Sequence, residues 1–414
     1  MNIWILCHYA VPPSLGGINR HYYFKRYLEK MGHTVRIFTS SHIHNFNINM
    51  IEGKELYLEK EVDGEVYTFV RSSNYRGNGI SRLFNLVSFP FRMVRACKQF
   101  PAPDVIYTSS PALPTSFMVM RYALKKNIPC VFEVRDLWPE SIVEYRGISR
   151  NNPLIKILYG MEKWMYRKAD QIIFTMEKGV NYITGKGWDR VIDIRKVHNI
   201  NNGVDLEEYR SNLAAYKLED PDLDNPDTYK AVYTGSIRQV NNIGMLINAW
   251  RKFSQDTSNK VQLLIFGKGN EKDDLVRYCA EQNITDVVFK EQVDKKYIPS
   301  ILSKCDLTIM HGNSTGLMKY GASPNKLYEY LAAGKPILFT YPSEENPVEK
   351  YHCGIMIREQ SVDTIAASIK ELYGLNEKEL EQIKNNTAKA AGEFDFTELS
   401  KKLEQVLTLA VERK

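Results

Sequence analysis

Residues 321–336 read Gly-Ala-Ser-Pro-Asn-Lys-Leu-Tyr-Glu-Tyr-Leu-Ala-Ala-Gly-Lys-Pro, and this stretch carries the start and stop signals of one short helix. Ser323 favours the N-cap position, and Pro324 fits the first helical position. Gly334 is suited to end the helix, and Pro336 then opens a strand. The stretch predicts a helix–strand unit.

Working outward, short β-rich runs alternate with helical stretches in both halves of the chain. This alternation is typical of parallel sheets covered by helices. The predicted strands are Ile3–Cys7, Thr34–Thr39, Val105–Thr108, Cys130–Val134 and Gln171–Thr175 in the first half, and Lys230–Thr234, Val261–Phe266, Val287–Phe289, Leu307–Met310 and Pro336–Thr340 in the second. We therefore expect an α/β protein with two Rossmann-like domains whose sheets face an interdomain cleft.

The length of 414 residues also favours two domains of roughly 200 residues each. A turn at 201–205 and a polar stretch at 217–228 mark the hinge. We expect a first domain over 1–205 and a second over 206–395. Residues 396–414 form an amphipathic helix that we expect to cross back to the first domain.

Composition narrows the classes of protein. The content of 43% hydrophobic and 25% charged residues is that of a globular protein. The six cysteines are scattered and form no CxxC pair, which predicts reduced core cysteines in a cytoplasmic protein. The first residues have no signal-peptide pattern, and no stretch is long and apolar enough to span a membrane. The net charge of +6 suits an anionic partner.

The helix predicted after Ser323 is the strongest candidate site. The first amides of the helix, near Asn325 and Lys326, point out of its positive end, and the Lys326 ammonium adds a full charge there. Glu329 shares their face and can accept hydrogen bonds from both hydroxyls of a ribose. The alternative interpretation is an ordinary capped helix with a surface Lys–Glu pair.

Two further turns follow predicted strands of the second half. Gly235 lets a ligand approach the backbone, and Arg238 can clamp phosphate oxygens. Gly267 repeats this strand–glycine turn. The alternative is a tight strand-to-helix turn with an exposed arginine.

In the first half, Gly16 and Gly17 lie between the first strand and the first helix. The full G-x-G-x-x-G spacing is absent, and no acidic residue ends the second strand, so a dinucleotide site is disfavoured. The glycine pair still suits the close approach of a phosphate or a sugar.

These motifs, in this order, resemble glycosyltransferase family 4, and the similarity covers nearly the whole chain. It includes the Gly16-Gly17 turn, the segment Glu133-Val134-Arg135-Asp136-Leu137-Trp138-Pro139, the hinge Asn202-Gly203-Val204-Asp205, the Gly235 turn and the segment 323–336. The resemblance is to bacterial enzymes that build O-antigen, capsule or exopolysaccharide units. It implies the GT-B fold and sugar transfer from a nucleotide diphosphate, expected to be a UDP-sugar, with retained anomeric configuration.

The resemblance also assigns roles by position. Glu329 matches the second glutamate of the Glu-x7-Glu motif, which binds the donor ribose. Lys326 and Arg238 would neutralise the donor phosphates, and Gly17 would donate its amide to the sugar-proximal phosphate. Further substrate contacts are expected from Gly16, Arg135, Glu140, Gly235, Gly267, Ser323, Pro324 and Asn325.

Four positions depart from the family pattern. The first glutamate of the motif is replaced by Gly321, and the usual arginine and lysine of the glycine turn are Ser236 and Asn241. Arg135 stands where a histidine is frequent. These changes concern sugar binding more than the nucleotide site.

The resemblance implies transfer without a metal ion or another cofactor, because positive groups stabilise the departing nucleotide diphosphate. No Asp-x-Asp pair lies where a metal-dependent transferase would need it. In a front-face mechanism the leaving phosphate takes the acceptor proton, so no protein base is needed. Asp136 and Glu140 are either contributors to sugar or acceptor contacts, Asp136 being the catalytic candidate, or structural residues.

Basic and apolar residues interleave from Arg76 to Phe100, namely Arg82, Leu83, Phe84, Phe89, Phe91, Arg92, Val94, Arg95 and Lys98. A helix of this kind suits peripheral contact with an anionic membrane, and a polyprenyl-diphosphate-linked sugar would then be the natural acceptor. The alternative is a domain helix with a solvated basic face.

Three other functions remain open. A nucleotide-sugar epimerase of the same architecture would interconvert sugars without transfer to an acceptor. A non-catalytic nucleotide-sugar-binding protein would not hydrolyse the donor. A dehydrogenase is disfavoured by the incomplete glycine fingerprint, and no feature indicates nucleic-acid binding.

Overall fold

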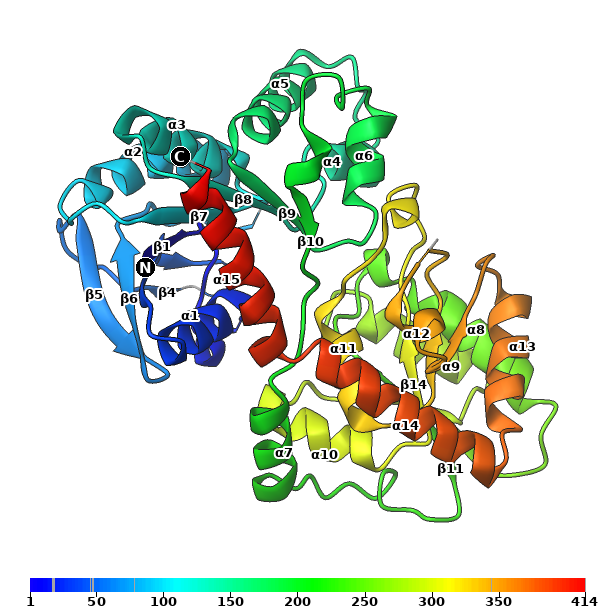
Figure 1. Ribbon diagram of the computed structural model, residues 1–414. Coiled ribbons are helices and arrows are strands. Elements are labelled where there is room, and N and C mark those ends of the chain that lie inside the picture. The colour runs from blue at the N-terminus through cyan, green and yellow to red at the C-terminus, as the bar shows by residue number, and fades with distance from the viewer. Residues whose placement is uncertain (17–18, 45, 47, 78, 344, 414) are drawn as a thin grey trace. The chain divides into compact units, whose positions relative to one another are not determined.

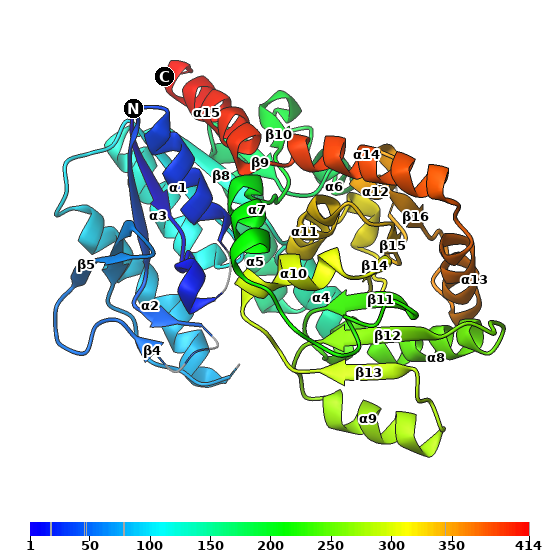
Figure 2. The same ribbon diagram turned by 90° about the horizontal axis from the view of Figure 1, so that it is seen from below.

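The structure is a computed structural model, and it describes residues 1–16, 19–44, 46, 48–77, 79–343 and 345–413. The chain forms two compact units (Figures 1 and 2). The first unit contains Met1–Asn201 together with Phe396–Lys414, and the second contains Asn202–Asp395.

The first unit is built around an eight-stranded sheet in the order β10-β9-β8-β7-β1-β2-β6-β5. Its strands are β1 (Asn2–Leu6), β2 (Thr34–Ser40), β5 (Tyr57–Val62), β6 (Glu65–Val70), β7 (Val105–Ser109), β8 (Cys130–Val134), β9 (Gln171–Phe174) and β10 (Val197–Asn199), with a separate pair β3 (His42–Ile43) and β4 (Ile48–Asn49). All pairs of the large sheet are parallel except β5–β6. The register of β1 places Ile5 beside Ile37 and Tyr107, and all three are fully buried.

The helices of the first unit are α1 (Arg20–Lys30), α2 (Ile80–Cys97), α3 (Leu113–Lys126), α4 (Glu140–Arg146), α5 (Pro153–Lys168), α6 (Gly179–Gly185) and α15 (Phe396–Glu412), with 3₁₀ turns η1 (Pro13–Leu15) and η2 (Ile194–Lys196). From β1 the chain moves through α1 to β2 on one side, and from β7 through α3 to β8 on the other. Because such crossovers are right-handed, α1 and α3 cover opposite faces of the sheet. The order reverses between β1 and β7, and ligands of α/β proteins bind at the carboxyl ends of such strands.

The second unit is built around a six-stranded parallel sheet in the order β13-β12-β11-β14-β15-β16. Its strands are β11 (Tyr229–Thr234), β12 (Val261–Phe266), β13 (Val287–Lys290), β14 (Leu307–Met310), β15 (Ile337–Phe339) and β16 (Gly354–Met356). Its helices are α7 (Leu206–Ala215), α8 (Ile243–Ser254), α9 (Lys272–Glu281), α10 (Ile298–Ser303), α11 (Asn325–Ala333), α12 (Pro347–Lys350), α13 (Val362–Tyr373) and α14 (Glu377–Glu393), with turns η3 (Gln239–Asn241), η4 (Lys295–Tyr297) and η5 (Met318–Tyr320). The reversal of strand order falls between β11 and β14.

The strands predicted from the sequence are present in both sheets, and their bounds differ by at most one residue at each end. Their apolar runs are buried because parallel strands are covered by helices on both faces. The hairpin of β5 and β6 was not predicted. Residues 58–61 of β5 are exposed, so its sequence lacks the apolar run that marks a central strand. Asp63 and Gly64 form the turn with positive φ angles of 56° and 77°.

The boundary between the two units differs from the predicted one by four residues, because Asn202–Asp205 belong to the second unit. The Asn202 side-chain amide donates to the Ser323 carbonyl oxygen at 2.6 Å. Val204 forms a bridge to Asp395 and donates its amide to the Phe394 carbonyl oxygen at 3.1 Å. These bonds fix the linker to the second unit, so the polypeptide crosses between units at residues 201–202 and 395–396.

The last helix, α15, belongs to the first unit although it follows the second in sequence. Its stripe of Leu399, Leu403, Val406 and Leu407 is buried. The helix lies beside α1 in both views, and Phe396 stacks on Tyr23 with ring centroids 4.5 Å apart (Figures 1 and 2). The apolar stripe of the sequence is therefore the face that packs against α1 and the sheet.

All six cysteines are free and buried. Within the described ranges, no helix is long and apolar enough to cross a membrane.

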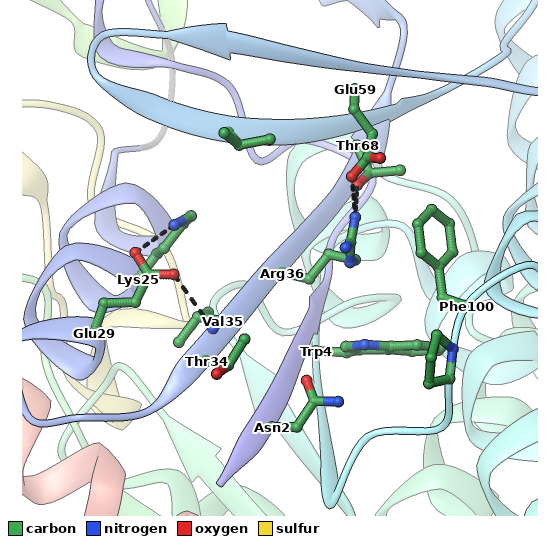
Figure 3. A pocket seen from close by; sticks show the side chains of 12 residues that line it. Asn2, Trp4, Lys25, Glu29, Thr34, Val35, Arg36, Glu59, Thr68 and Phe100 are labelled. Carbon is green, nitrogen blue, oxygen red and sulfur yellow. Dashed lines mark hydrogen bonds and ion pairs between the residues drawn. The ribbon is translucent and has the colours of Figure 1, made fainter.

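A cavity of about 330 Å³ lies in the first unit (Figure 3). Asn2 and Thr34, the first residues of β1 and β2, line it, so it opens at the amino ends of the strands. The Arg36 guanidinium lies over the Phe100 ring at 4.2 Å and pairs with Glu59. This is the edge of the sheet opposite to the one where α/β proteins bind ligands, so we place no site in this cavity.

Candidate functional site

The carboxyl end of β11 meets the start of α11 at the reversal point of the second sheet. Gly235 follows β11 with a φ of 153°, and a Cβ atom at this position would overlap the Lys326 Nζ atom. Gly267 follows β12, where a Cβ would overlap the Gly235 carbonyl oxygen. Both positions therefore require glycine, because the backbone of one turn packs on the other and on the Lys326 side chain.

The start of α11 differs from the prediction. Pro324 is the N-cap and Asn325 is the first helical residue, so Ser323 does not cap the helix. The Ser323 hydroxyl instead lies 2.7 Å from the Tyr328 hydroxyl and accepts a hydrogen bond from the Asn202 amide at 2.8 Å. Ser323 thus joins the linker to α11. Asn325 and Lys326 are the first two residues of the helix, and the first amides of a helix have no acceptor within it.

Lys326 is the central cation of this site. Its Nζ atom is buried and has no hydrogen-bond partner among the described residues. The ammonium lies over the Tyr233 ring, 4.1 Å from the centroid. Burial lowers the pKa of Lys326 from its usual 10.5 to about 7, although Glu329 acts in the opposite direction. A buried cation without a partner is costly unless an anion completes it.

Glu329 lies one turn along α11 and is 17% exposed. Its carboxylate is 3.6 Å from the Lys295 Nζ atom, which comes from the η4 turn. Burial raises the pKa of Glu329, and the nearby cations Lys295 and Lys326 oppose that shift. Sequence reasoning missed Lys295 and Tyr233, because neither follows a motif spacing relative to α11.

Arg238 is not drawn into this arrangement. Its side chain is exposed, and in the described part of the chain it makes no hydrogen bond or ion pair. The two positions that depart from the family pattern bond to each other instead, since the Ser236 hydroxyl donates to the Asn241 side-chain oxygen at 2.8 Å. Lys326 is therefore the cation that lies against the Gly235 turn.

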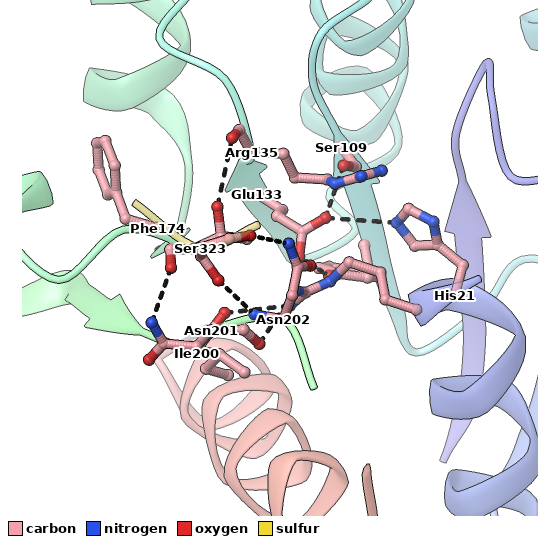
Figure 4. Close-up of polar contacts among 12 residues, drawn as sticks. His21, Ser109, Glu133, Arg135, Phe174, Ile200, Asn201, Asn202 and Ser323 are labelled. Atoms are coloured by element: carbon pink, nitrogen blue, oxygen red, sulfur yellow. Dashed lines mark hydrogen bonds and ion pairs between the residues drawn. The ribbon is translucent and has the colours of Figure 1, made fainter. Parts of the chain in front are cut away.

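The first unit has a charged cluster at the corresponding edge of its own sheet (Figure 4). Glu133 is the penultimate residue of β8, is fully buried, and pairs with the Arg20 guanidinium at 2.9 Å. It also accepts hydrogen bonds from the Tyr107 hydroxyl and, at 2.6 Å, from the Ser109 hydroxyl. Burial would raise the pKa of Glu133, but Arg20 and His21 hold it well below its usual range.

His21 completes this cluster at 3.4 Å from the Glu133 carboxylate. Burial lowers the pKa of His21, and the contact with Glu133 opposes that shift.

Arg135 and Asp136 follow β8 directly. The Nε and Nη1 atoms of Arg135 are buried and have no hydrogen-bond partner within the described residues, as in the case of Lys326. The Arg135 backbone amide is held by the Ser110 hydroxyl at 2.9 Å. Asp136 is exposed. Both side chains thus lie at the carboxyl edge of the sheet and remain candidates for substrate contact.

Glu140 differs from the expectation of a substrate contact. It is buried at the start of α4, and Arg150 binds its carboxylate at 2.6 Å. Tyr159 donates to it at 2.5 Å, and Lys186 pairs with it as well. Because three partners already use both oxygens, Glu140 holds α4, α5 and α6 together.

The glycine pair of the first unit is only partly described. Gly16 ends η1 with a φ of 73°, and a Cβ atom there would lie 2.7 Å from the Phe46 ring. Gly17 lies outside the described residues. In the described ranges, no group of three or more His, Cys, Asp or Glu residues could hold a metal ion.

Comparison with known proteins identifies the class. Residues 15–208 match the profile described as Glycosyltransferase Family 4, and residues 217–390 match Glycosyl transferases group 1. The chain belongs to this family of group 1, family 4 glycosyltransferases.

Individual relatives are distant. An uncharacterized glycosyltransferase of Methanocaldococcus jannaschii, MJ1069, is 20% identical over 242 residues, which are 56% of this chain and 59% of that protein. The match thus spans less than two thirds of that relative's length.

Solved structures show the same fold over the whole chain. The sucrose-phosphate synthase of Thermosynechococcus elongatus has a TM-score of 0.72 at 16% identity, with 100% of both chains covered. WaaG, a glycosyltransferase involved in lipopolysaccharide biosynthesis, has a TM-score of 0.66 at 13% identity, covering 98% of this chain and 99% of that one. Anabaena HepE, solved with UDP-glucose, has a TM-score of 0.63 at 13% identity over 99% of each chain. The predicted GT-B fold is confirmed.

Proposed function

We propose that this protein transfers a sugar from a UDP-sugar to a cell-envelope glycan or lipid-linked sugar, with retention of configuration and without a metal ion. The observation that carries the proposal is the buried Lys326 ammonium, which lies against the Gly235 backbone and has no hydrogen-bond partner in the part of the chain that the structure describes. A nucleotide diphosphate supplies that anion.

In this proposal, different residues of α11 bind different parts of the donor. The amides of Asn325 and Lys326, together with the Lys326 ammonium, bind the diphosphate at the positive end of the helix. Gly235 and Gly267 keep side chains away from the phosphates. Glu329 accepts hydrogen bonds from the ribose hydroxyls. HepE, which shares the fold, was solved with UDP and with UDP-glucose, which supports uridine as the base.

The same cations serve the chemical step. As the bond between sugar and phosphate breaks, negative charge develops on the departing diphosphate, and Lys326 stabilises it. Arg238 lies in the turn after β11, and its exposed side chain can rotate to provide a second cation. In a front-face reaction the departing phosphate oxygen accepts the proton of the acceptor hydroxyl.

The first unit provides the acceptor side in this proposal. Arg135 offers its Nε and Nη1 atoms, which have no hydrogen-bond partner within the described ranges, at the end of β8, and Asp136 offers an exposed carboxylate. From the sequence, the Gly16-Gly17 pair is proposed to let the backbone approach a sugar or phosphate. The structural similarity to WaaG and the family resemblance support an acceptor of the cell envelope and a position at the cytoplasmic face of the membrane.

A donor screen tests the proposal. The protein is titrated calorimetrically with UDP-, GDP- and dTDP-sugars, and donor hydrolysis is measured in parallel. We expect one UDP-sugar to bind and to be slowly hydrolysed. Glu329→Ala should weaken binding about 10- to 100-fold, since hydrogen bonds to charged groups are worth about 1.5–3 kcal/mol. Glu371→Ala, on the exposed face of α13, is the matched control.

Two outcomes would contradict the proposal. Equal affinity of Glu329→Ala and the control would remove the ribose assignment. Interconversion of the free sugar nucleotide without any transfer or hydrolysis would identify an epimerase.

A further inference from the structure

Helix α2 of the first unit has an apolar face that is exposed. The residues of this face recur at helical spacing: Ile80, Leu83, Phe84, Val87 and Phe91. Their side chains are between 53% and 87% exposed, with Ile80 the most exposed of all. We call these five residues the α2 face.

The opposite side of α2 serves the fold. Asn85, Phe89 and Met93 are fully buried, and the helix packs on α3. Phe89, one of the apolar residues of the stretch predicted to suit a membrane surface, belongs instead to the core. The α2 face is not needed to build the core, so the apolar identity of its residues requires another reason.

The segment around α2 is strongly basic. Residues 71–103 contain six Arg and Lys residues and no Asp or Glu. The chain as a whole has 55 Lys and Arg against 49 Asp and Glu, so this segment carries a charge equal to the entire net charge of +6. Arg76 precedes the helix, Arg95 lies in its last turn and Lys98 caps it, and all three are exposed.

We infer that the α2 face is the surface by which this protein docks on an anionic lipid bilayer. An exposed apolar face flanked by cations, on a helix too polar to span, is the pattern of a helix that lies in the membrane interface. Partner proteins of a purely apolar kind would gain nothing from the basic residues, whereas lipid headgroups attract each of them.

The same helix contacts the edge of the sheet that the proposed function assigns to the acceptor. The Asn85 side chain lies 3.0 Å from the His8 imidazole, and His8 lies two residues after the end of β1. The Arg82 guanidinium donates to the Tyr9 hydroxyl at 3.5 Å. The lipid identity of the acceptor rests on the proposed function, whereas docking of α2 does not. A docked α2 would hold this edge next to the bilayer, where a lipid-linked sugar is presented.

Vesicle flotation tests the docking. Wild-type protein is mixed with vesicles of phosphatidylcholine alone or with phosphatidylglycerol added. We expect binding only to the anionic vesicles and a loss at raised salt. Ile80→Ser/Phe84→Ser/Phe91→Ser should reduce partition by more than about tenfold, since each buried apolar group contributes. Arg95→Gln/Lys98→Gln should reduce it by roughly tenfold.

The controls are exposed residues outside α2. Val276→Ser/Leu380→Ser is the control for the apolar change, and Lys378→Gln/Lys402→Gln is the control for the charge change. Binding of the controls should equal that of wild type. Calorimetry with UDP should give equal donor affinity for all variants, so a failure of donor binding in wild type would affect the proposed function and not this inference.

Two results would overturn the inference. One is vesicle binding that the α2 variants do not change, or that wild type lacks altogether. The other is a dimer, measured by light scattering, that the serine variant converts to a monomer, because the α2 face would then cover a second copy of the chain.

Discussion

Each of the two sheets has a buried charged group at its carboxyl edge. The two groups differ in whether other protein groups neutralise the charge. In the first unit, Glu133 is surrounded by Arg20, Tyr107 and Ser109, which neutralise it and satisfy its oxygens. In the second unit, the Lys326 ammonium lies over the Tyr233 ring at 4.1 Å and finds no hydrogen-bond partner among the residues that the structure describes. A buried charge that the protein completes stabilises the fold, whereas one left incomplete indicates a ligand.

Removing the neutralised charge of Glu133 should have the largest effect on stability. Glu133→Ala removes the carboxylate that neutralises the buried Arg20 guanidinium and leaves its bonds to the Ile200 and Asn201 carbonyl oxygens. Loss of one member of a buried ion pair costs about 3–5 kcal/mol. We expect the free energy of unfolding to fall by this amount, measured by urea denaturation. A destabilisation below about 1 kcal/mol would mean that the cluster behaves like a surface ion pair and that the contrast with Lys326 is unfounded.

Removing the positive charge of Lys326 should reduce catalysis and not stability. Lys326→Met keeps the length of the side chain and removes the cation, so kcat/KM should fall about 10²- to 10³-fold, as when one donor to a developing negative charge is lost. The free energy of unfolding should stay the same or rise, because a buried cation without a partner has been removed. Urea denaturation should show a lower free energy of unfolding for Glu133→Ala and an equal or higher one for Lys326→Met. Transfer kinetics then measures the loss of activity in Lys326→Met. A Lys326→Met enzyme with near-normal kinetics would refute it.

The smallest effect is a pH dependence of donor binding. The pKa of Lys326 is about 7 in the empty protein, and a bound diphosphate should raise it. Above pH 7 the free protein has lost this proton and must take it up on binding, so affinity should fall by up to about tenfold per pH unit. Calorimetry in buffers of different ionisation enthalpy measures the uptake. The Lys326→Met variant should show no such uptake, and equal uptake in both proteins would assign the proton elsewhere.

The lowered pKa of Lys326 also predicts the direction in which the free energy of unfolding changes with pH. Between pH 7 and 10.5 the unfolded chain binds this proton and the folded protein does not. The contribution of Lys326 to the free energy of unfolding therefore rises with pH over this window, and it is fully unfavourable below it. Donor binding and stability should thus respond to pH in opposite directions.

Much of the second unit's site was predictable because it is local. The strand-glycine turn at Gly235 and the helix start near Asn325 are both short segments whose residue types state their geometry. Glu329 was predictable from the three- and four-residue spacing on one helix. The assignment of Ser323 as N-cap was wrong because its hydroxyl is taken by Tyr328 and by the linker residue Asn202, a contact across 121 positions.

The first unit was harder to predict from sequence. Glu133, Arg20 and Tyr107 are far apart in the chain, and only the register of β1, β7 and β8 brings them together. Glu140 had the residue type of a substrate contact, but Arg150, Tyr159 and Lys186 close around it. A sequence pattern gives the type of a side chain and not the number of partners it will find.

The sequence by itself determined the two parallel sheets, the glycine turns and the helix that carries Lys326 and Glu329, because these depend on periodicity and on neighbours within one turn. Only the tertiary structure decided which charges are completed and which apolar faces are covered. Those outcomes depend on contacts between distant segments, as with Glu133 in its cluster, Lys326 without a hydrogen-bond partner among the described residues, and Phe89 in the core beside an exposed Phe91.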